Sequence, residues 1–337
     1  MDVINSSLKP ESRNSPRLFT NRAGSILRIT FTVAALLWVF HDIHADRLIK
    51  EMASLKWCWI IAAVGCDIAS YISQGVRWSM LLAPLSRVSW FRSTQAIYAG
   101  LFINEILPMR FGELVRAFMV SHRTGNAFPA ILPSMAMERL FDGIWLALAI
   151  GLVSMFVPLP GYLVDAADVL GIAVCALTGV FLFLVFRAEG PIQRYIERHT
   201  GDDRFGGLFG ILARLIAGLS NMRGRGILFP SFIVSLALLF LQAAAFWLVM
   251  IAYGMSLTFW SGCAVFLIVH FGTAIPNAPS NIGSYQFFTV LGLMLFGVDK
   301  TTAAGFSLVV FIILTIPLWL IGLLAINTAG FTIGGLK

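Results

Sequence analysis

Residues 226–298 read GILFPSFIVSLALLFLQAAAFWLVMIAYGMSLTFWSGCAVFLIVHFGTAIPNAPSNIGSYQFFTVLGLMLFGV, and they include no Asp, Glu, Lys or Arg. A helix needs about 20 mostly apolar residues to span a bilayer, so this run is long enough for several crossings. The whole chain of 337 residues is 58% hydrophobic and 12% charged, whereas soluble domains carry about 25% charged residues. This composition excludes a water-soluble or disordered protein and predicts an all-α, polytopic integral membrane helical bundle.

Apolar segments on both sides of this run predict about six full spans, at about 25–43, 57–83, 129–157, 166–186, 227–250 and 302–327. Two further apolar regions are interrupted, and we expect each to form a re-entrant broken hairpin. If the hairpins instead cross fully and return, the helix count rises but the parity is unchanged. The predicted organisation is a flexible tail, 1–24, and a single transmembrane domain, 25–330, with halves at about 57–157 and 227–327.

The distribution of basic residues predicts the orientation. Arginines and lysines gather in the tail and in the connection 187–225, while the loop 158–165 has none. Positive loops favour the cytoplasm, so we expect both termini and residues 187–225 to be cytoplasmic, in the inner membrane of a bacterium. Within that connection, apolar residues at helical spacing from Phe205 to Leu219 predict an amphipathic helix, lying on the leaflet or packed against the bundle. The net charge of +7 follows these loops and does not indicate nucleic-acid binding.

The first interruption is NEILPMRFGELVR, residues 104–116. Its proline and glycine oppose a regular helix, and non-helical backbone at membrane depth is tolerated where it is buried in protein or lines a wet cavity. We expect Glu113 to pair with Arg110 or Arg116. A cytoplasmic loop with solvated charges is the alternative. The candidate headgroup residues here are Asn104, Pro108, Arg110, Gly112, Glu113 and Arg116.

The second interruption is TAIPNAPSNIGSYQ, residues 273–286, and it carries no charge. Two interrupted apolar segments at corresponding places in two halves point to a transport site. A neutral break can still offer backbone N–H groups and the positive end of a helix that begins near Gly283. We therefore expect it to recognise hydroxyl or phosphate oxygens, through Asn277, Pro279, Asn281 and Gly283.

Several polar residues lie within the predicted spans. Asp67, Ser70, Gln74 and Arg77 share one helix face, and Asp67 either carries a proton during transport or makes a structural contact. Arg77 could simply snorkel to the interface. A second group, which either lines the transport path or forms a helix-packing network, comprises Glu138, Arg139 and Asp142. The lone His270 is interpreted as a packed residue rather than a proton carrier.

The sequence predicts neither a cofactor nor a metal. The four cysteines form no CxxC pair, and no His and Cys cluster has zinc spacing. No GxxxxGK[ST] nucleotide-binding loop occurs, so active transport would need an ion gradient or a separate partner.

Four motifs resemble one family, the membrane region of lysylphosphatidylglycerol synthase, also called flippase-like. INEILPMRFGELVR is similar to its N-x-x-L-P-x-R-x-G-E-x-x-R signature, MERLFDGIW to its E-R-L-x-D segment, RWSMLL to its R-W-x-x-L-L segment, and APSNIGSYQ to its late S-P-G-G-x-G-x-x-E segment. Ser280 and Asn281 replace the paired glycines, and Gln286 replaces the acid. This form is similar to a branch associated with hopanoid and glycolipid pathways. Nothing in the chain resembles the soluble synthase domain.

The residues and the resemblance together predict a lipid transporter without enzymatic activity. It would move or bind a phospholipid, glycolipid or hopanoid, with the head in a groove between the two hairpins and the tails in the bilayer. Lipid-biosynthesis enzymes are possible partners. The alternative is a membrane enzyme or an accessory subunit acting on a lipid-linked substrate, for which paired titratable groups such as Glu113, Glu138 and Asp142 would be needed.

Overall fold

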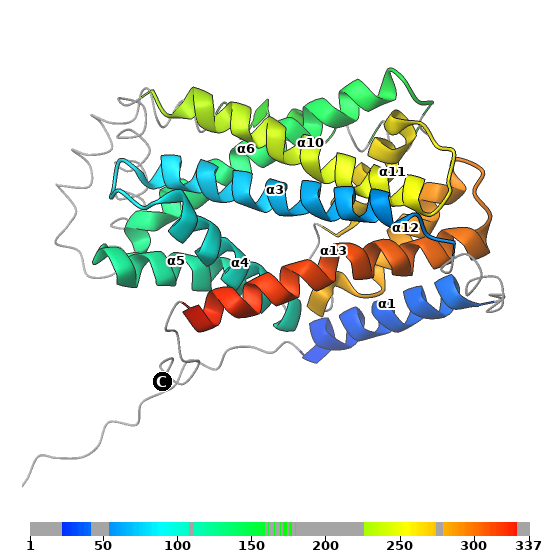
Figure 1. Ribbon diagram of the computed structural model, residues 1–337, viewed down its shortest axis with the longest axis horizontal. Helices are drawn as coiled ribbons and strands as arrows, with labels where there is room; N and C mark the ends of the chain where they lie inside the picture. The colour runs from blue at the N-terminus through cyan, green and yellow to red at the C-terminus, as the bar shows by residue number, and fades with distance from the viewer. Residues whose placement is uncertain are drawn as a thin grey trace, which may run out of the picture.

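The computed structural model describes residues 22–41, 54–107, 111–158, 226–273 and 279–328, with scattered positions between 161 and 179. Regular structure in these parts of the chain is helical, which confirms the predicted fold class. The long helices run roughly along the long axis of the molecule (Figure 1). The tail before residue 22 and the connection 187–225 lie outside the described residues, as does most of the predicted span 166–186, whose described positions are helical.

Five long helices correspond to predicted spans: α1 (Arg22–Phe40), α3 (Trp57–Leu82), α6 (Phe128–Ser154), α10 (Leu228–Ala252) and α13 (Lys300–Thr328). Of these, α3, α10 and α13 are long and apolar enough to cross a membrane. The 27-residue α6 is also long enough, but it carries Glu138, Arg139 and Asp142 in its middle. Its charges therefore need partners within the bundle, since charged groups at membrane depth face protein or water rather than lipid.

Both predicted interruptions break the helices. The first hairpin consists of α4 (Trp90–Ile106) and α5 (Gly112–Thr124), and the second consists of α11 (Phe259–Gly272) and α12 (Ser284–Met294), with the short 3-10 helix η2 (Pro279–Asn281) before α12. The first hairpin lies at one end of the molecule and the second at the other (Figure 1). Each half therefore reads long helix, broken hairpin, long helix.

Close backbone contact holds the first hairpin together. A Cβ atom at Gly112 would lie 1.7 Å from the carbonyl oxygen of Gly100, so only glycine allows α5 to approach α4 this closely. The side-chain oxygen of Asn104 accepts a hydrogen bond from the Gly112 N–H at 2.7 Å, which ties the two sides of the break together. The role of Gly112 in the structure is thus helix packing.

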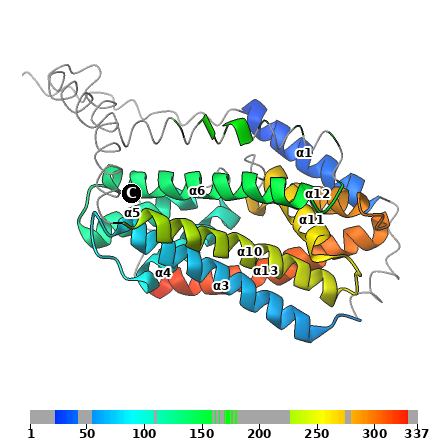
Figure 2. The ribbon, with the colours of Figure 1, turned by 90° about the horizontal axis from the view of Figure 1, so that it is seen from above.

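Two apolar cores flank the middle of the bundle. The core around the first hairpin includes the buried residues Trp78, Ile97 and Met119. The core around the second hairpin includes Phe246 and Phe306. The helix pair α3 and α10 packs along the molecule and joins them, and α13 packs against both α4 and α12. The view from above shows α3, α10 and α13 side by side (Figure 2). This arrangement leaves the polar residues of both halves in the space between the two cores.

Candidate functional site

The two breaks meet in the middle of the protein. The Ser280 hydroxyl, at the second break, donates a hydrogen bond of 2.9 Å to the backbone oxygen of Glu105, at the first break. The Glu105 carboxylate accepts a hydrogen bond of 3.4 Å from the indole of Trp319 on α13. Segments 175 residues apart in the sequence are therefore joined directly.

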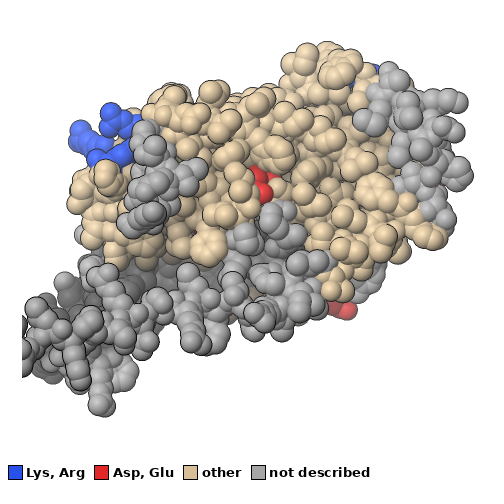
Figure 3. Space-filling view, turned by 90° about the horizontal axis from the view of Figure 1, so that it is seen from below, with Lys and Arg blue, Asp and Glu red and all other residues tan. Residues whose placement is uncertain are grey.

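A cavity of about 360 Å³ lies where the breaks meet. Its wall includes apolar side chains such as Leu101, Phe246 and Leu314, but polar groups from both halves face it as well. Among the described residues, the face in Figure 3 is mostly uncharged; acidic atoms are visible near its middle and at its lower edge, and a group of basic residues lies at the left end. The polar and charged lining residues are Asp67, Tyr71, Gln74, Arg77, Asn104, Glu105, Glu113, Arg139, Asp142, Ser235, Gln242, His270, Thr273, Ser280, Asn281, Tyr285 and Thr315.

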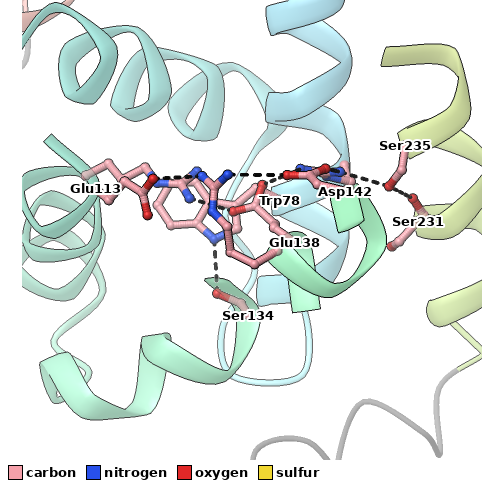
Figure 4. Close-up of polar contacts among 10 residues, drawn as sticks. Trp78, Glu113, Ser134, Glu138, Asp142, Ser231 and Ser235 are labelled. Carbon is pink, nitrogen blue, oxygen red and sulfur yellow. Dashed lines mark hydrogen bonds and ion pairs between the residues drawn. The ribbon is translucent and has the colours of Figure 1, made fainter. Parts of the chain in front are cut away.

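Three arginines and three carboxylates form an open chain of ion pairs beside this cavity, which we call the charge network (Figure 4). In order, its members are Arg116, Glu138, Arg77, Asp142, Arg139 and Glu113. Its buried side centres on Glu138, whose two oxygens lie 3.2 Å from Arg77 and 2.8 Å from Arg116. Arg77 continues to Asp142 and also donates to the Ser235 hydroxyl at 2.9 Å. The signs alternate along the charge network, so each charge is compensated by an immediate neighbour.

The other side of the charge network faces the cavity. Arg139 lies 2.9 Å from Glu113 and 3.5 Å from Asp142. Its side chain is 48% exposed, whereas Arg77 is fully buried. Among the three arginines of the charge network, Arg139 is therefore the one whose guanidinium is most accessible to a ligand.

Arg116 is held as a structural group. Its guanidinium lies over the Trp78 ring, 4.8 Å from the ring centroid, and the Trp78 indole donates to the Ser134 hydroxyl at 3.0 Å. A cation over an indole face gains electrostatic stabilisation when both are desolvated. Arg116 thus packs behind the cavity wall.

Two interpretations of these charges are wrong, namely the pairing of Glu113 with Arg116 and the snorkelling of Arg77. The alternative pairing of Glu113 with Arg110 lies outside the described residues. Glu113 pairs with Arg139 of α6 rather than with Arg116, because α5 packs against α6 and directs Arg116 to Glu138. Arg77 does not snorkel, because acids of α6 reach it in the bundle interior. Arg139 contacts Asp142 directly, one turn along its own helix.

Seven of the predicted site residues line the cavity: Asp67, Gln74, Asn104, Glu113, Arg139, Asp142 and Asn281. Gly112, Arg116, Glu138 and Gly283 lie outside the lining. Pro108, Arg110 and Asn277 fall outside the described residues, and the placement of the Pro279 side chain is not described.

The backbone at Gly283 does not offer the free donor that we expected. Its N–H donates to the side-chain oxygen of Gln286 at 2.7 Å, closing the start of α12. Gly283 has φ of 89°, and a Cβ there would lie 3.0 Å from the backbone oxygen of Thr32 on α1. The glycine is required by backbone conformation and by packing against α1.

Sequence reasoning missed several lining residues. Gln242 is isolated in the apolar helix α10, and Tyr71 and Tyr285 resemble ordinary packing aromatics. The signal that could have found Gln242 is an amide in an otherwise apolar helix, because such a group needs a hydrogen-bond partner. Nothing local distinguishes the two tyrosines from packing residues.

The sequence model described as "Lysylphosphatidylglycerol synthase TM region" matches residues 25–322. The chain belongs to this family. A protein named "UPF0104 membrane protein" from Methanothermobacter thermautotrophicus is 24% identical over 298 residues, covering 84% of this chain and 86% of that protein. A protein named "Glycosyltransferase AglD" from Haloferax volcanii is 25% identical over 321 residues, covering 86% of this chain.

The chain spans about half the length of AglD, 51%. The similarity to that protein is thus a similarity to part of it. The comparisons therefore establish that this chain is a membrane protein of the lysylphosphatidylglycerol synthase TM type.

The described cavity lining carries an excess of negative charge. Asp67, Glu105, Glu113 and Asp142 oppose Arg77 and Arg139, so the formal charge of these lining groups is −2 when all four carboxyls are ionised and His270 is neutral, and it stays negative when one carboxyl is protonated. Glu138 and Arg116 lie behind the wall and cancel each other.

Proposed function

We propose that this protein carries the head of a polar lipid through its central cavity while the acyl chains stay in the bilayer. The observation that supports this proposal most is the joint lining of one cavity by two broken hairpins. Irregular backbone at membrane depth is tolerated where it lines such a cavity. The apolar surface around it matches a lipid's tails, and the polar lining matches its head.

Arg139 is the proposed contact for a lipid phosphate. Its guanidinium is half exposed and can present two N–H groups to two oxygens. A phosphate bound there would replace Glu113 as its partner, so binding would break the last ion pair of the charge network. Asn104, Gln242 and Asn281 add neutral donors and acceptors for hydroxyl groups.

The cavity reaches the surface beside the first break. Leu107 lines the cavity and is also 44% exposed, and its neighbour Ile106 is 57% exposed. Apolar residues at such an opening suit a lipid whose tails remain outside. The negative lining favours a neutral or zwitterionic head, such as a glycolipid or phosphatidylethanolamine, over a head with several negative charges.

Reconstitution into vesicles tests this proposal. Fluorescent phosphatidylethanolamine, phosphatidylglycerol and glycolipid in the inner leaflet are protected from an impermeant quencher unless they change leaflet. We expect protein-dependent quenching, with phosphatidylglycerol the slowest. Arg139→Ala should slow it at least about tenfold, since hydrogen bonds to charged groups contribute about 1.5–3 kcal/mol.

The matched control is Arg92→Ala, which removes an exposed arginine away from the cavity. It should leave the rate unchanged. Identical quenching in vesicles with and without protein would overturn the proposal.

The name of one relative, a glycosyltransferase, favours a second candidate, a membrane enzyme that acts on a lipid-linked sugar. Assay of the same preparation for sugar transfer from a lipid-linked donor would distinguish it. Turnover without lipid movement would favour the enzyme. For the transport proposal we place the protein in the cytoplasmic membrane of a bacterium, with both termini inside and lipid-biosynthesis enzymes as partners that supply the lipid.

A further inference from the structure

Asp67 differs from the other acids of the cavity in having no partner for its carboxylate. It lies near the middle of α3, is 5% exposed and lines the cavity. Within the described part of the chain, no arginine, lysine or histidine forms an ion pair with it, and no hydrogen bond reaches its side-chain oxygens. Ser70 contacts only its backbone oxygen, at 2.7 Å.

The groups that face Asp67 come from several helices. Its charge acts on the phenols of Tyr71 on α3, Tyr98 on α4 and Tyr285 on α12. Glu105 on α4 also acts on Tyr71 and so shares this end of the cavity. The Tyr98 hydroxyl is buried without a hydrogen-bond partner. The groups that interact electrostatically at this end of the cavity are thus three tyrosines and one further acid, and none of them is a cation.

The cations of the cavity are engaged elsewhere. Arg77 is ten residues along α3, about 15 Å by the helix rise, and it binds Asp142 and Glu138. Arg139 on α6 binds Glu113 and Asp142. From α10 and α13 the lining polar groups are uncharged and include Gln242 and Thr315. His270 on α11 also lines the cavity, and its charge acts on Asp142.

An uncompensated carboxylate at this position is costly, because burial of a charge without a partner forfeits its hydration. A proton or a metal cation could remove that cost. No group of three or more His, Cys, Asp or Glu residues in the described chain is arranged to hold a metal ion. The tyrosines and Glu105 supply no positive charge to compensate the Asp67 carboxylate, so a proton on the carboxyl removes the cost without a further ligand.

We propose that Asp67 is a proton-binding site whose occupancy is coupled to lipid movement, an inference that rests on the proposed transport function. In the closed cavity the side chain is a neutral carboxyl. When water enters from one side, its O–H bond breaks, the proton passes to water, and the electron pair stays on the carboxylate. The next closure requires a proton to return. The proton gradient would then bias the direction of lipid movement.

The test is lipid movement in vesicles under imposed gradients. Reversing a pH gradient should reverse the net leaflet distribution of the fluorescent lipid with the wild-type chain. Asp67→Asn should still exchange lipid but give the same distribution for both gradients. The matched control is Asp165→Asn, at an exposed acid outside the cavity, and it should respond as the wild type does.

A second measurement does not depend on transport. A protonated carboxyl has its own infrared C=O band, which we expect in reconstituted wild-type protein at neutral pH and not in Asp67→Asn. If the asparagine variant does not fold, Asp67→Glu serves instead, because a protonated glutamic acid should shift that band.

The outcomes test the proton site and the transport proposal separately. Lipid exchange that ignores the pH gradient, or an unchanged infrared band in Asp67→Asn, overturns the proton site and leaves transport standing. A distribution that follows a Na⁺ gradient instead also overturns it. No protein-dependent exchange under any gradient overturns the transport proposal itself, whereas the infrared band would still report the proton.

Discussion

At the scale of single residues, the charge network explains how six ionised groups coexist inside an apolar bundle. Glu138 is fully buried and serves both Arg77 and Arg116, so its removal leaves two buried cations with less compensation. The side chains of Arg139 and Glu113 are 48% and 27% exposed, so water can solvate both charges when the pair separates. Burial therefore divides the charge network into a structural side and a side that is accessible to a ligand.

This division predicts different stabilities for two matched variants. Glu138→Gln should lower the free energy of unfolding by about 3–5 kcal/mol, as expected when one partner of a buried pair is removed. Glu113→Gln should cost about 0–1 kcal/mol, the range for exposed pairs. Thermal unfolding in detergent measures both. Equal losses would contradict the assignment of Glu138 to the structural side.

At the scale of elements, the approach of α4 and α5 depends on two glycines that face each other, Gly100 and Gly112. Gly112→Ala places a methyl group where the Gly100 carbonyl lies, so the helices must separate, and we expect a clear loss of thermal stability. Gly151→Ala is the control, because a Cβ there meets nothing within 4 Å. It should be neutral or stabilising by up to about 1 kcal/mol, the helix-propensity gain of alanine over glycine. Similar effects of the two substitutions would argue against the close contact.

The second hairpin gives a related prediction. Gly283→Val forces a β-branched residue into a positive-φ conformation and toward Thr32 of α1, so it should destabilise the start of α12 and impair lipid binding. Ile282→Val trims one methylene from a side chain that is 39% exposed, and it should be tolerated. Lipid binding and thermal unfolding of the two purified variants provide the comparison. If both bind lipid equally well, the break does not shape the site.

At the scale of the whole molecule, the C-terminal ends of α3 and α13 and the start of α10 lie at the same end as the first hairpin (Figure 1). Arg87 lies between α3 and α4, and Arg92 lies in the first turn of α4. Arg92 interacts electrostatically with Arg123 at the end of α5. The basic residues of this end suit the cytoplasmic face.

Single-cysteine labelling in intact cells tests the orientation, after replacement of Cys58, Cys66, Cys175 and Cys263. A cysteine at position 200 should be protected from an impermeant reagent, because positive loops are retained inside. A cysteine at position 161 should be labelled, which controls for reagent access. Labelling at position 200 from outside would reverse the topology.

The sequence by itself determined the helical class, the membrane environment and the positions of the two breaks. Those properties follow from local composition: apolar length sets the spans, and proline or glycine interrupts them. It also indicated most of the polar residues that line the cavity, because polar groups in apolar helices stand out. Only the tertiary structure decided their partners. The pairing of Arg116 with Glu138, the pairing of Glu113 with Arg139, and the unpaired state of Asp67 depend on which helices pack together. Ion pairing acts over a few ångströms between distant parts of the chain, and spacing along one helix does not contain that information.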